Sequence, residues 1–243
     1  MTGTIPNSLS CMTQLRHLSL QAASLTGSIP SYFTSLINLE VLDFHENKLL
    51  GPIPLLIVAL TKLQVLNLEG NKFTGHIPLE LWTIASLRSL ALGENHLSGS
   101  IAFNIAALTK LKSLTLHSNQ FEGSLPSIST LTDMEILFLN NNSWLSGTLP
   151  SFLFSLSNLA GMNLQRSNLK GTIPSSIFNL TKLEFLDLID NQLSGTVSSL
   201  IGIMTQLTIL LIANNDLSGS ILQCPGQIDV DCDKISCDCC KCR

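Results

Sequence analysis

Two carboxylates and a histidine are the side chains best placed for acid–base chemistry in this chain. Asp43 and His45 stand two residues apart where apolar and polar residues alternate, and Glu69 follows His45 by 24 residues. In a strand, positions i and i+2 share one face, and nearby carboxylates favour a charged imidazole, which would make binding pH-dependent. A solvated surface histidine is the simpler interpretation. Neither a nucleophile nor an oxyanion donor accompanies these residues, so we expect no enzymatic activity.

Six of the seven cysteines crowd the C-terminal end of the chain. They are Cys224, Cys232, Cys237, Cys239, Cys240 and Cys242. Three disulfides among them would imply an oxidising compartment, and this is the interpretation we favour. Thiolates packed this densely are also candidate ligands for zinc or copper, although adjacent cysteines suit few tetrahedral sites. Lipidation or intermolecular pairing is a third alternative. Cys11 stands far from the others and is expected to be a free thiol.

A 24-residue repeat positions Asp43, His45 and Glu69. Its pattern is Leu-x-x-Leu-x-Leu-x-x-Asn-x-Leu-x-Gly-x-Ile-Pro, and all spacings are 24 except neighbouring ones of 23 and 25. Its first position falls at Leu15, Leu39, Leu63, Leu87, Leu111, Met134, Leu159, Leu183 and Leu207. A fixed period of this length indicates one supersecondary unit, here called a coil, stacked on copies of itself.

Each recurring position of the repeat pattern predicts a particular local structure. The alternating leucines predict a short strand, and stacked strands predict a parallel sheet with neighbours about 4.8 Å apart. An asparagine follows most strands, where its amide can satisfy backbone groups of a buried turn. Ala23 and Ser167 interrupt this column, so those turns are expected to be less firmly held. The strictly recurring glycine predicts a positive φ or close contact between coils.

The repeat resembles that of plant-type leucine-rich-repeat proteins, as at Leu63 to Pro78. The resemblance covers about residues 2–222 and implies an α/β fold: a right-handed solenoid with a parallel β-sheet on its concave face and short helices or turns on its convex side. We therefore expect a repeat domain over 1–222, with about nine full repeats, and a Cys-rich cap over 223–243. This tail resembles those of microalgal members. In the family, Cys224 and Cys232 would occupy the positions of a disulfide-bonded C-terminal cap.

The resemblance also implies a function. Family members include ectodomains of receptor-like kinases and receptor-like proteins, so the chain is expected to bind a protein or peptide through its strand face, with a co-receptor as a further partner. The alternative is a secreted inhibitor of a foreign hydrolase, similar to inhibitors of pectin-degrading enzymes. Metal binding by the tail is the least favoured reading. No kinase motif occurs in the sequence, and we expect no cofactor.

Positions between the leucines are free to vary and form the predicted ligand face. Early coils carry acidic residues and histidines there, and late coils become apolar. The candidate contacts are Asp43, His45, Asn67, Glu69, His117, Phe138, Trp144, Asn163, Phe185, Asp187, Ile189 and Leu211. An extended face with a charged half and an apolar half suits peptide or protein binding. Trp144 adjoins a one-residue insertion, and its side chain can serve as an outward anchor or fold into the core. Trp82 is assigned to packing.

Charge and hydropathy restrict the location and the partners. The net charge is −4 and Lys and Arg are not clustered, which argues against nucleic-acid binding. No apolar run approaches the roughly 20 residues of a membrane span. Residues 1–6 read as the second half of a coil, so a truncated N-terminus is expected. Asn141 and Asn179 begin glycosylation sequons, which favours an extracellular or cell-surface location.

Overall fold

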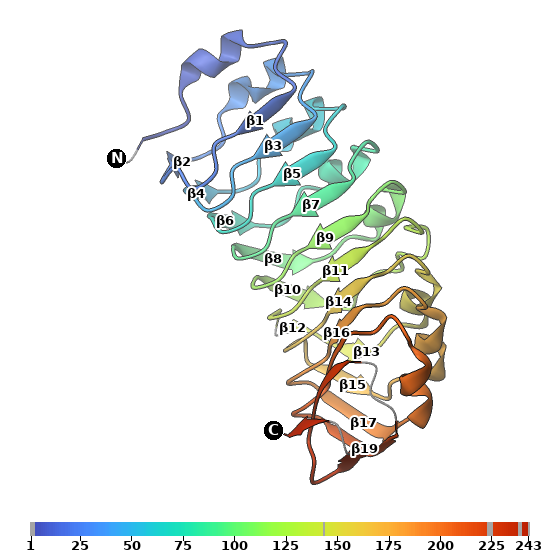
Figure 1. Ribbon diagram of the computed structural model, residues 1–243. Coiled ribbons are helices and arrows are strands. Elements are labelled where there is room, and N and C mark those ends of the chain that lie inside the picture. Colours follow the sequence, from blue (N-terminus) through green and yellow to red (C-terminus); the bar gives the residue numbers. More distant parts are fainter. Residues whose placement is uncertain (1–2, 143, 223–225, 238–239, 243) are drawn as a thin grey trace.

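The computed structural model describes residues 3–142, 144–222, 226–237 and 240–242. The chain forms one elongated, curved stack of coils with its two ends at opposite ends of the stack (Figure 1). A parallel sheet of eleven strands runs along this stack. Its strands, in order, are β1 (His17–Ser19), β3 (Val41–Asp43), β5 (Val65–Asn67), β7 (Ser89–Ala91), β9 (Ser113–Thr115), β11 (Ile136–Phe138), β14 (Gly161–Asn163), β16 (Phe185–Asp187), β18 (Ile209–Leu211), β20 (Gln227–Val230) and β22 (Lys241–Cys242).

Two smaller parallel sheets form a second side of the stack. The six-stranded side sheet contains β2 (Thr26–Gly27), β4 (Lys48–Gly51), β6 (Lys72–Gly75), β8 (His96–Ser100), β10 (Gln120–Gly123) and β12 (Trp144–Leu145). The five-stranded side sheet contains β13 (Gly147–Thr148), β15 (Leu169–Gly171), β17 (Gln192–Val197), β19 (Asp216–Ile221) and β21 (Ile235–Cys237). The fold is therefore the predicted solenoid, with two additional sheets on its flank.

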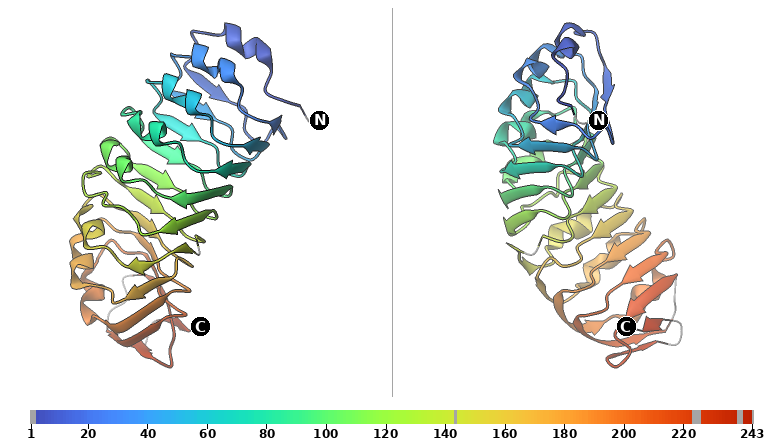
Figure 2. Two further views of the ribbon diagram at one scale, coloured as in Figure 1. Left: turned by 180° about the vertical axis from the view of Figure 1, so that it is seen from behind. Right: turned by 90° about the vertical axis from the view of Figure 1, so that its left-hand side faces the viewer.

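Short 3₁₀ helices line the outer edge of the curve (Figure 2). They are η1 (Asn7–Cys11), η2 (Ser31–Ser35), η3 (Leu55–Ala59), η4 (Leu79–Thr83), η5 (Phe103–Ala107), η6 (Ser151–Ser155), η7 (Ser175–Asn179) and η8 (Ser199–Ile203). Most begin directly after a proline, whose fixed φ suits a helix start and whose missing N–H would have no partner there. This agrees with the expected short helices on the convex side.

The core lies between the main sheet and the helices. Strand leucines such as Leu42, Leu66 and Leu90 stack in register from coil to coil and are fully buried. Each unit alone could not bury its apolar face, so the stack itself supplies the hydrophobic stabilisation. Trp82 belongs to this core with 1% of its surface exposed, which confirms its assignment to packing.

The asparagine column holds the turns that follow the main strands. The amide oxygen of Asn119 accepts a hydrogen bond from Leu97 N–H at 2.9 Å, in the preceding coil. Its amide nitrogen donates to the carbonyl oxygens of Leu92 at 2.9 Å and Leu116 at 3.1 Å. One buried side chain thus satisfies donors and acceptors of two coils, as predicted.

The two coils without this asparagine have a differently shaped turn. Both Ala22 and Ser24 adopt a positive φ around Ala23, and Arg166 and Asn168 do so around Ser167. The asparagine of the next coil then accepts two N–H groups instead of one. For the first turn, Asn47 accepts from Ala23 at 3.1 Å and Leu25 at 2.8 Å. Each of these turns is therefore held by the coil that follows it.

The two irregular spacings change the structure locally. In the 23-residue unit the segment after Pro126 is one residue short, and the described residues form no helix between β10 and β11. In the 25-residue unit the side strand is split at Ser146 into β12, which pairs with β10, and β13, which pairs with β15. The residue one coil beyond Ser146 is Asn168, whose left-handed φ of 55° takes it out of the ladder. This split separates the two side sheets.

The C-terminal tail continues the stack with two further main strands. Leu210 pairs with Ile228 between β18 and β20, and Val230 pairs with Cys242 between β20 and β22. Disulfides join Cys232 to Cys242 and Cys237 to Cys240. The expected pairing of Cys232 with Cys224 is therefore wrong, because β22 pairs Cys242 with Val230, two residues before Cys232, and Cys232 bonds to Cys242. Cys224 and Cys239 lie outside the described residues. Cys11 is exposed and free.

Candidate ligand-binding face

The main sheet positions most of the predicted ligand contacts on one open face. Alternation within each strand turns the leucines inward and the residues between them outward. Half-buried side chains on this face are Asp43, His45, Asn67, Glu69, His117, Phe138, Asn163, Phe185 and Leu211. Their partial burial comes from contacts with neighbouring coils, so their orientations are fixed by the stack.

His45 contacts Asp43 of its own coil and Asn67 of the next coil rather than Glu69. Its Nδ1 lies 2.7 Å from Oδ1 of Asp43 and 3.3 Å from the amide nitrogen of Asn67. The pairing of Asp43 and His45 is as the alternation predicts. The expected contact with Glu69 is not formed, because the Glu69 side chain turns toward the C-terminal coils.

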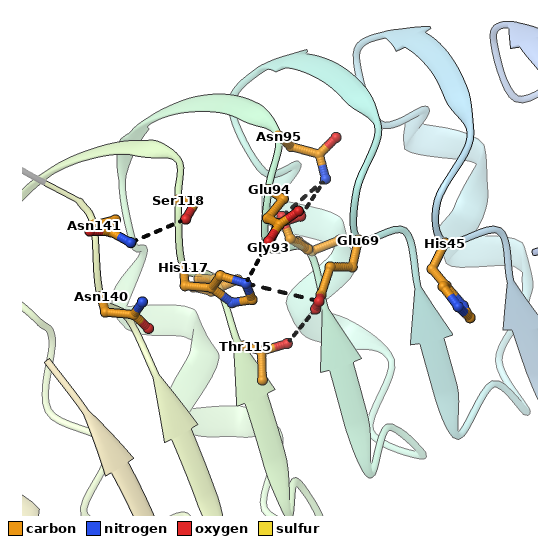
Figure 3. A network of polar contacts seen from close by, with 12 residues as sticks. His45, Glu69, Gly93, Glu94, Asn95, Thr115, His117, Ser118, Asn140 and Asn141 are labelled. Carbon is orange, nitrogen blue, oxygen red and sulfur yellow. Dashed lines mark hydrogen bonds and ion pairs between the residues drawn. The ribbon is translucent and has the colours of Figure 1, made fainter. Parts of the chain in front are cut away.

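His117 is the centre of a second polar cluster that joins three coils (Figure 3). Its Nε2 lies 3.9 Å from Oε1 of Glu69 and 3.8 Å from Oε1 of Glu94. Thr115 donates to Oε2 of Glu69 over 3.4 Å. The His117 ring lies over Gly93, where an added Cβ would come within 2.4 Å of its Cε1. Only a glycine at this position lets the imidazole lie between the two carboxylates.

Apolar side chains occupy the next coils of the same face. The rings of Phe138 and Phe185 meet edge to face, with centroids 5.9 Å apart. The Phe138 ring lies over Gly161, where a Cβ would come within 3.3 Å of Cε1. Register places Ile209 beside Phe185. The face therefore changes from acidic to apolar along the stack, as the sequence predicts.

The other three predicted contacts do not belong to this half-buried set. Ile189 has 2% of its surface exposed and Asp187 has 5%, so neither presents its side chain to solvent. The stack continues beyond these coils with β20 and β22, which the repeat pattern alone did not predict. Trp144 belongs to β12 of the six-stranded side sheet and not to the main sheet, and its side chain lies outside the described part of the structure.

The polar residues that end four of the main strands also have a structural role. Oδ1 of Asp43, Asn67, Asn163 and Asp187 accepts the backbone N–H two residues further on, at 3.0 to 3.2 Å. Such a bond mimics a backbone turn and ends the strand. A ligand that binds these residues must use their remaining polar atoms.

A row of polar contacts at the edge of the face was missed by the sequence analysis. Asp190 accepts hydrogen bonds from Nε of Arg166 at 2.9 Å and from Nδ2 of Asn214 at 2.6 Å. Burial alone would raise the pKa of Asp190, but these hydrogen bonds and the charge of Arg166 outweigh it and hold that pKa below its ordinary value. All three residues have a positive φ immediately before the asparagine column, and this shared position is the signal that could have revealed them.

The remaining predicted sites have clear places in the fold. Asn179 ends η7 and is exposed on the convex side. Asn141 lies half-buried at the edge of the main sheet, where its amide donates to Oγ of Ser118 at 3.4 Å. Among the described residues, no three His, Cys, Asp or Glu side chains lie close enough together to hold a metal ion.

Two sequence-family models match parts of this chain. A "Leucine rich repeat" family model matches residues 13–73, and a second model of that description matches residues 110–131. The chain is a leucine-rich-repeat protein. Comparison with curated proteins gives no match. Within the described residues, none of the helices has the length and apolar character that a bilayer span requires.

Solved structures resemble this leucine-rich-repeat protein closely. The ectodomain of the Arabidopsis thaliana membrane receptor kinase GASSHO1/SCHENGEN3, in complex with Casparian strip integrity factor 2, is 38% identical with a TM-score of 0.87. That match covers 90% of this chain and 26% of the receptor chain. The Arabidopsis receptor kinase HAESA, in complex with the peptide hormone IDA and the co-receptor SERK1, is 31% identical with a TM-score of 0.85. There the match covers 96% of this chain and 42% of the other.

A third similar structure is a plant ice-binding protein. It is 27% identical with a TM-score of 0.80, and the match covers 99% of this chain and 77% of that protein. The chain thus spans less than half the length of the two receptor chains and most of the length of the ice-binding protein.

Proposed function

We propose that this protein is a recognition module that binds a peptide or protein ligand across the face of its main sheet. The supporting observation is the change of chemistry along that face. Glu69 and Glu94 flank His117 in one part, and the ring pair of Phe138 and Phe185 lies in the next. The buried leucines beneath are nearly uniform, so the variation is not required by the fold. The similar receptor kinase HAESA was solved in complex with a peptide hormone and a co-receptor, and GASSHO1/SCHENGEN3 in complex with Casparian strip integrity factor 2.

The two parts of the face would contribute differently to binding. Carboxylates on an open surface attract and orient a basic ligand, which raises the association rate more than the affinity. Aromatic and aliphatic side chains that lose water on binding supply most of the affinity. The favoured ligand is therefore an extended chain with a basic residue near Glu69 and an apolar residue near Phe185.

Display selection tests this function without a known ligand. A random peptide library is selected on the immobilised protein, and the enriched peptides are then measured against variants. Phe185→Ala is expected to weaken binding by about 1–2 kcal/mol, because it removes an anchor from a half-buried position. Ile203→Ala, an exposed apolar residue of η8 on the convex side, is the control and should leave affinity unchanged. Failure to enrich any peptide, or equal loss in both variants, would contradict the proposal.

An extracellular or cell-surface location is part of the same proposal. Two disulfides in the described tail favour an oxidising compartment, since cytosolic thiols are kept reduced. Non-reducing mass spectrometry of protein from its natural source should show Cys232 joined to Cys242. Fully reduced tail thiols in that material would exclude this location.

A second candidate function is supported by a hydroxyl column on the side sheets. The residue after each recurring glycine is a hydroxyl residue in six consecutive coils: Ser100, Ser124, Thr148, Thr172, Thr196 and Ser220. The methyl groups of Thr148 and Thr172 rest against the glycine of the next coil, where a Cβ would meet them at 3.1 Å and 2.9 Å. Each threonine is thereby held in one orientation.

Hydroxyl and methyl groups that recur once per coil suit an ordered lattice of water molecules. The strand register sets Thr148 opposite Lys170, so equivalent hydroxyls lie diagonally across the sheet, farther apart than the strand spacing of about 4.8 Å. The similarity to a plant ice-binding protein makes ice the lattice to test. Thermal hysteresis and ice-crystal shape are measured for the protein and for Thr172→Lys, which would interrupt the column. Thr61→Lys, at an exposed site away from the column, is the control. An absence of hysteresis in the unmodified protein would reject this function and leave peptide binding untouched.

A further inference from the structure

The convex side carries an apolar stripe that the fold does not require. Leu55, Leu79 and Phe103 are the first residues of η3, η4 and η5, which stack side by side. Their surfaces are 54%, 58% and 77% exposed. We call these three residues the convex stripe.

Other coils of the same chain show what this position needs structurally. The first residue of the remaining helices is polar in every case: Asn7, Ser31, Ser151, Ser175 and Ser199. Serine therefore begins the same helix in the same environment without difficulty. Three consecutive apolar exceptions, all exposed, indicate a surface that is covered by something else.

We propose that the convex stripe is the centre of a two-fold interface between two copies of this chain. A two-fold axis through Leu79 would place Leu79 against its own copy and Phe103 against the partner's Leu55, so the stripe is complementary to itself. Glu80 is the only charged residue in the three helices, so little charge has to be desolvated.

The exposed area is consistent with an interface of this kind. The convex stripe and the neighbouring Leu56, which is 41% exposed, present on the order of 500 Å² of side-chain surface, the size of patch that marks interaction sites. A standard interface buries about 800 Å² on each partner. The convex stripe would form the water-free centre of the interface, and polar residues of the flanking helices would form its solvent-exposed rim.

Such a dimer leaves the main-sheet face of both copies free. It is therefore independent of the proposed ligand binding, and it would present two ligand faces in one assembly. A ligand with two binding segments would gain avidity from this arrangement without any new contact.

Sedimentation over a wide concentration range tests the interface. The unmodified protein should dimerise reversibly, and the triple variant Leu55→Ser, Leu79→Ser, Phe103→Ser should raise the dissociation constant by on the order of 30-fold or more. Because serine occupies this position in other coils, the variant should keep its fold and its thermal midpoint. Leu200→Ser with Ile203→Ser removes exposed apolar residues of η8 and is the matched control. It should dimerise like the unmodified protein.

Cross-linking tests the orientation. In a Cys11→Ser background, Leu79→Cys should form a disulfide-linked dimer with itself, whereas Ile203→Cys should not. A protein that sediments as a monomer at every concentration overturns the proposal. So does a triple variant that dimerises as tightly as the unmodified protein.

Discussion

At the scale of single residues, glycine decides where the side chains of the ligand face can lie. Gly93 leaves room for the His117 ring and Gly161 for the Phe138 ring. Neither glycine has a positive φ, so neither is needed for its backbone conformation. Both are needed for the space that they leave. A missing side chain on one coil thus sets the orientation of a side chain on the neighbouring coil.

Gly93→Ala is expected to displace His117 from between Glu69 and Glu94. The added methyl would overlap the imidazole ring, and the strain should cost about 1–3 kcal/mol of unfolding free energy. The proton and nitrogen shifts of the His117 ring, measured by NMR, report the displacement. Gly3→Ala is the control, because nothing lies within 4 Å of a Cβ at that position. Unchanged His117 shifts in Gly93→Ala would contradict the packing described.

Asp190 makes stability depend on pH at the acid end. Its lowered pKa means that the ionised carboxylate stabilises the fold above its unfolded pKa, and this contribution disappears as the pH falls through the lower, folded pKa. Asp190→Asn should therefore be less stable than the unmodified protein at neutral pH, by about 1 kcal/mol or less. Urea unfolding at a series of pH values should show the two proteins converging in acid. A difference that grows in acid would exclude this explanation.

At the scale of elements, the turns after the main strands set the local stability of the stack. Most are held by their own asparagine, but the turns at Ala23 and Ser167 depend on the asparagine of the next coil. The side-chain oxygens of Asn47 and Asn191 therefore each accept one more hydrogen bond than the other asparagines of the column do. Inserting two left-handed residues is how the chain accommodates the missing amide.

Asn47→Ala should destabilise the protein more than Asn71→Ala. The Asn47 oxygen accepts two N–H groups and the Asn71 oxygen accepts one, while the amide nitrogens make equivalent bonds. Either change leaves buried groups without partners and should cost about 2–4 kcal/mol, with about 1 kcal/mol more for Asn47. Chemical denaturation monitored at both sites by hydrogen exchange measures the difference. Equal losses would show that the extra bond contributes nothing.

The sequence predicts these elements well because each position of the coil occurs in nine copies, so one deviating copy does not hide the pattern. Nine copies of one pattern identify the strand leucines, the asparagine turns and the outward positions even where one coil deviates. It fails where the outcome depends on a neighbouring coil. The turn of Glu69 toward His117, the burial of Asp187 and Ile189, and the pairing of Cys232 with Cys242 follow from register between coils. A single coil's sequence does not contain that information.

At the scale of the whole molecule, stability is close to a sum over coils and their interfaces. Each coil mainly contacts the coils next to it, so opening can begin at either end. The tail disulfides lie where such opening would start at the C-terminus. They restrict the unfolded tail and so protect the last strands.

Cys232→Ser with Cys242→Ser should loosen only the C-terminal coils. Hydrogen exchange is expected to become faster in β20 and to remain slow in β3 and β5, because coils far from the tail keep their neighbours. Mass spectrometry of peptic fragments resolves the two regions, and Cys11→Ser is the control for thiol removal. Faster exchange throughout the stack would mean that the molecule unfolds as one unit.

The split side strand at Ser146 has a mechanical consequence. Along most of the stack, the main sheet and a side sheet run side by side, and their hydrogen bonds both resist bending. At the split, the side-sheet ladder is interrupted between β12 and β13, whereas the main sheet is continuous. We therefore expect bending to be easiest there, in the coil of Phe138, which lies between the coil of His117 and the coil of Phe185. A load on the two ends should change the angle between the coil of His117 and the coil of Phe185 more than the angles elsewhere in the stack.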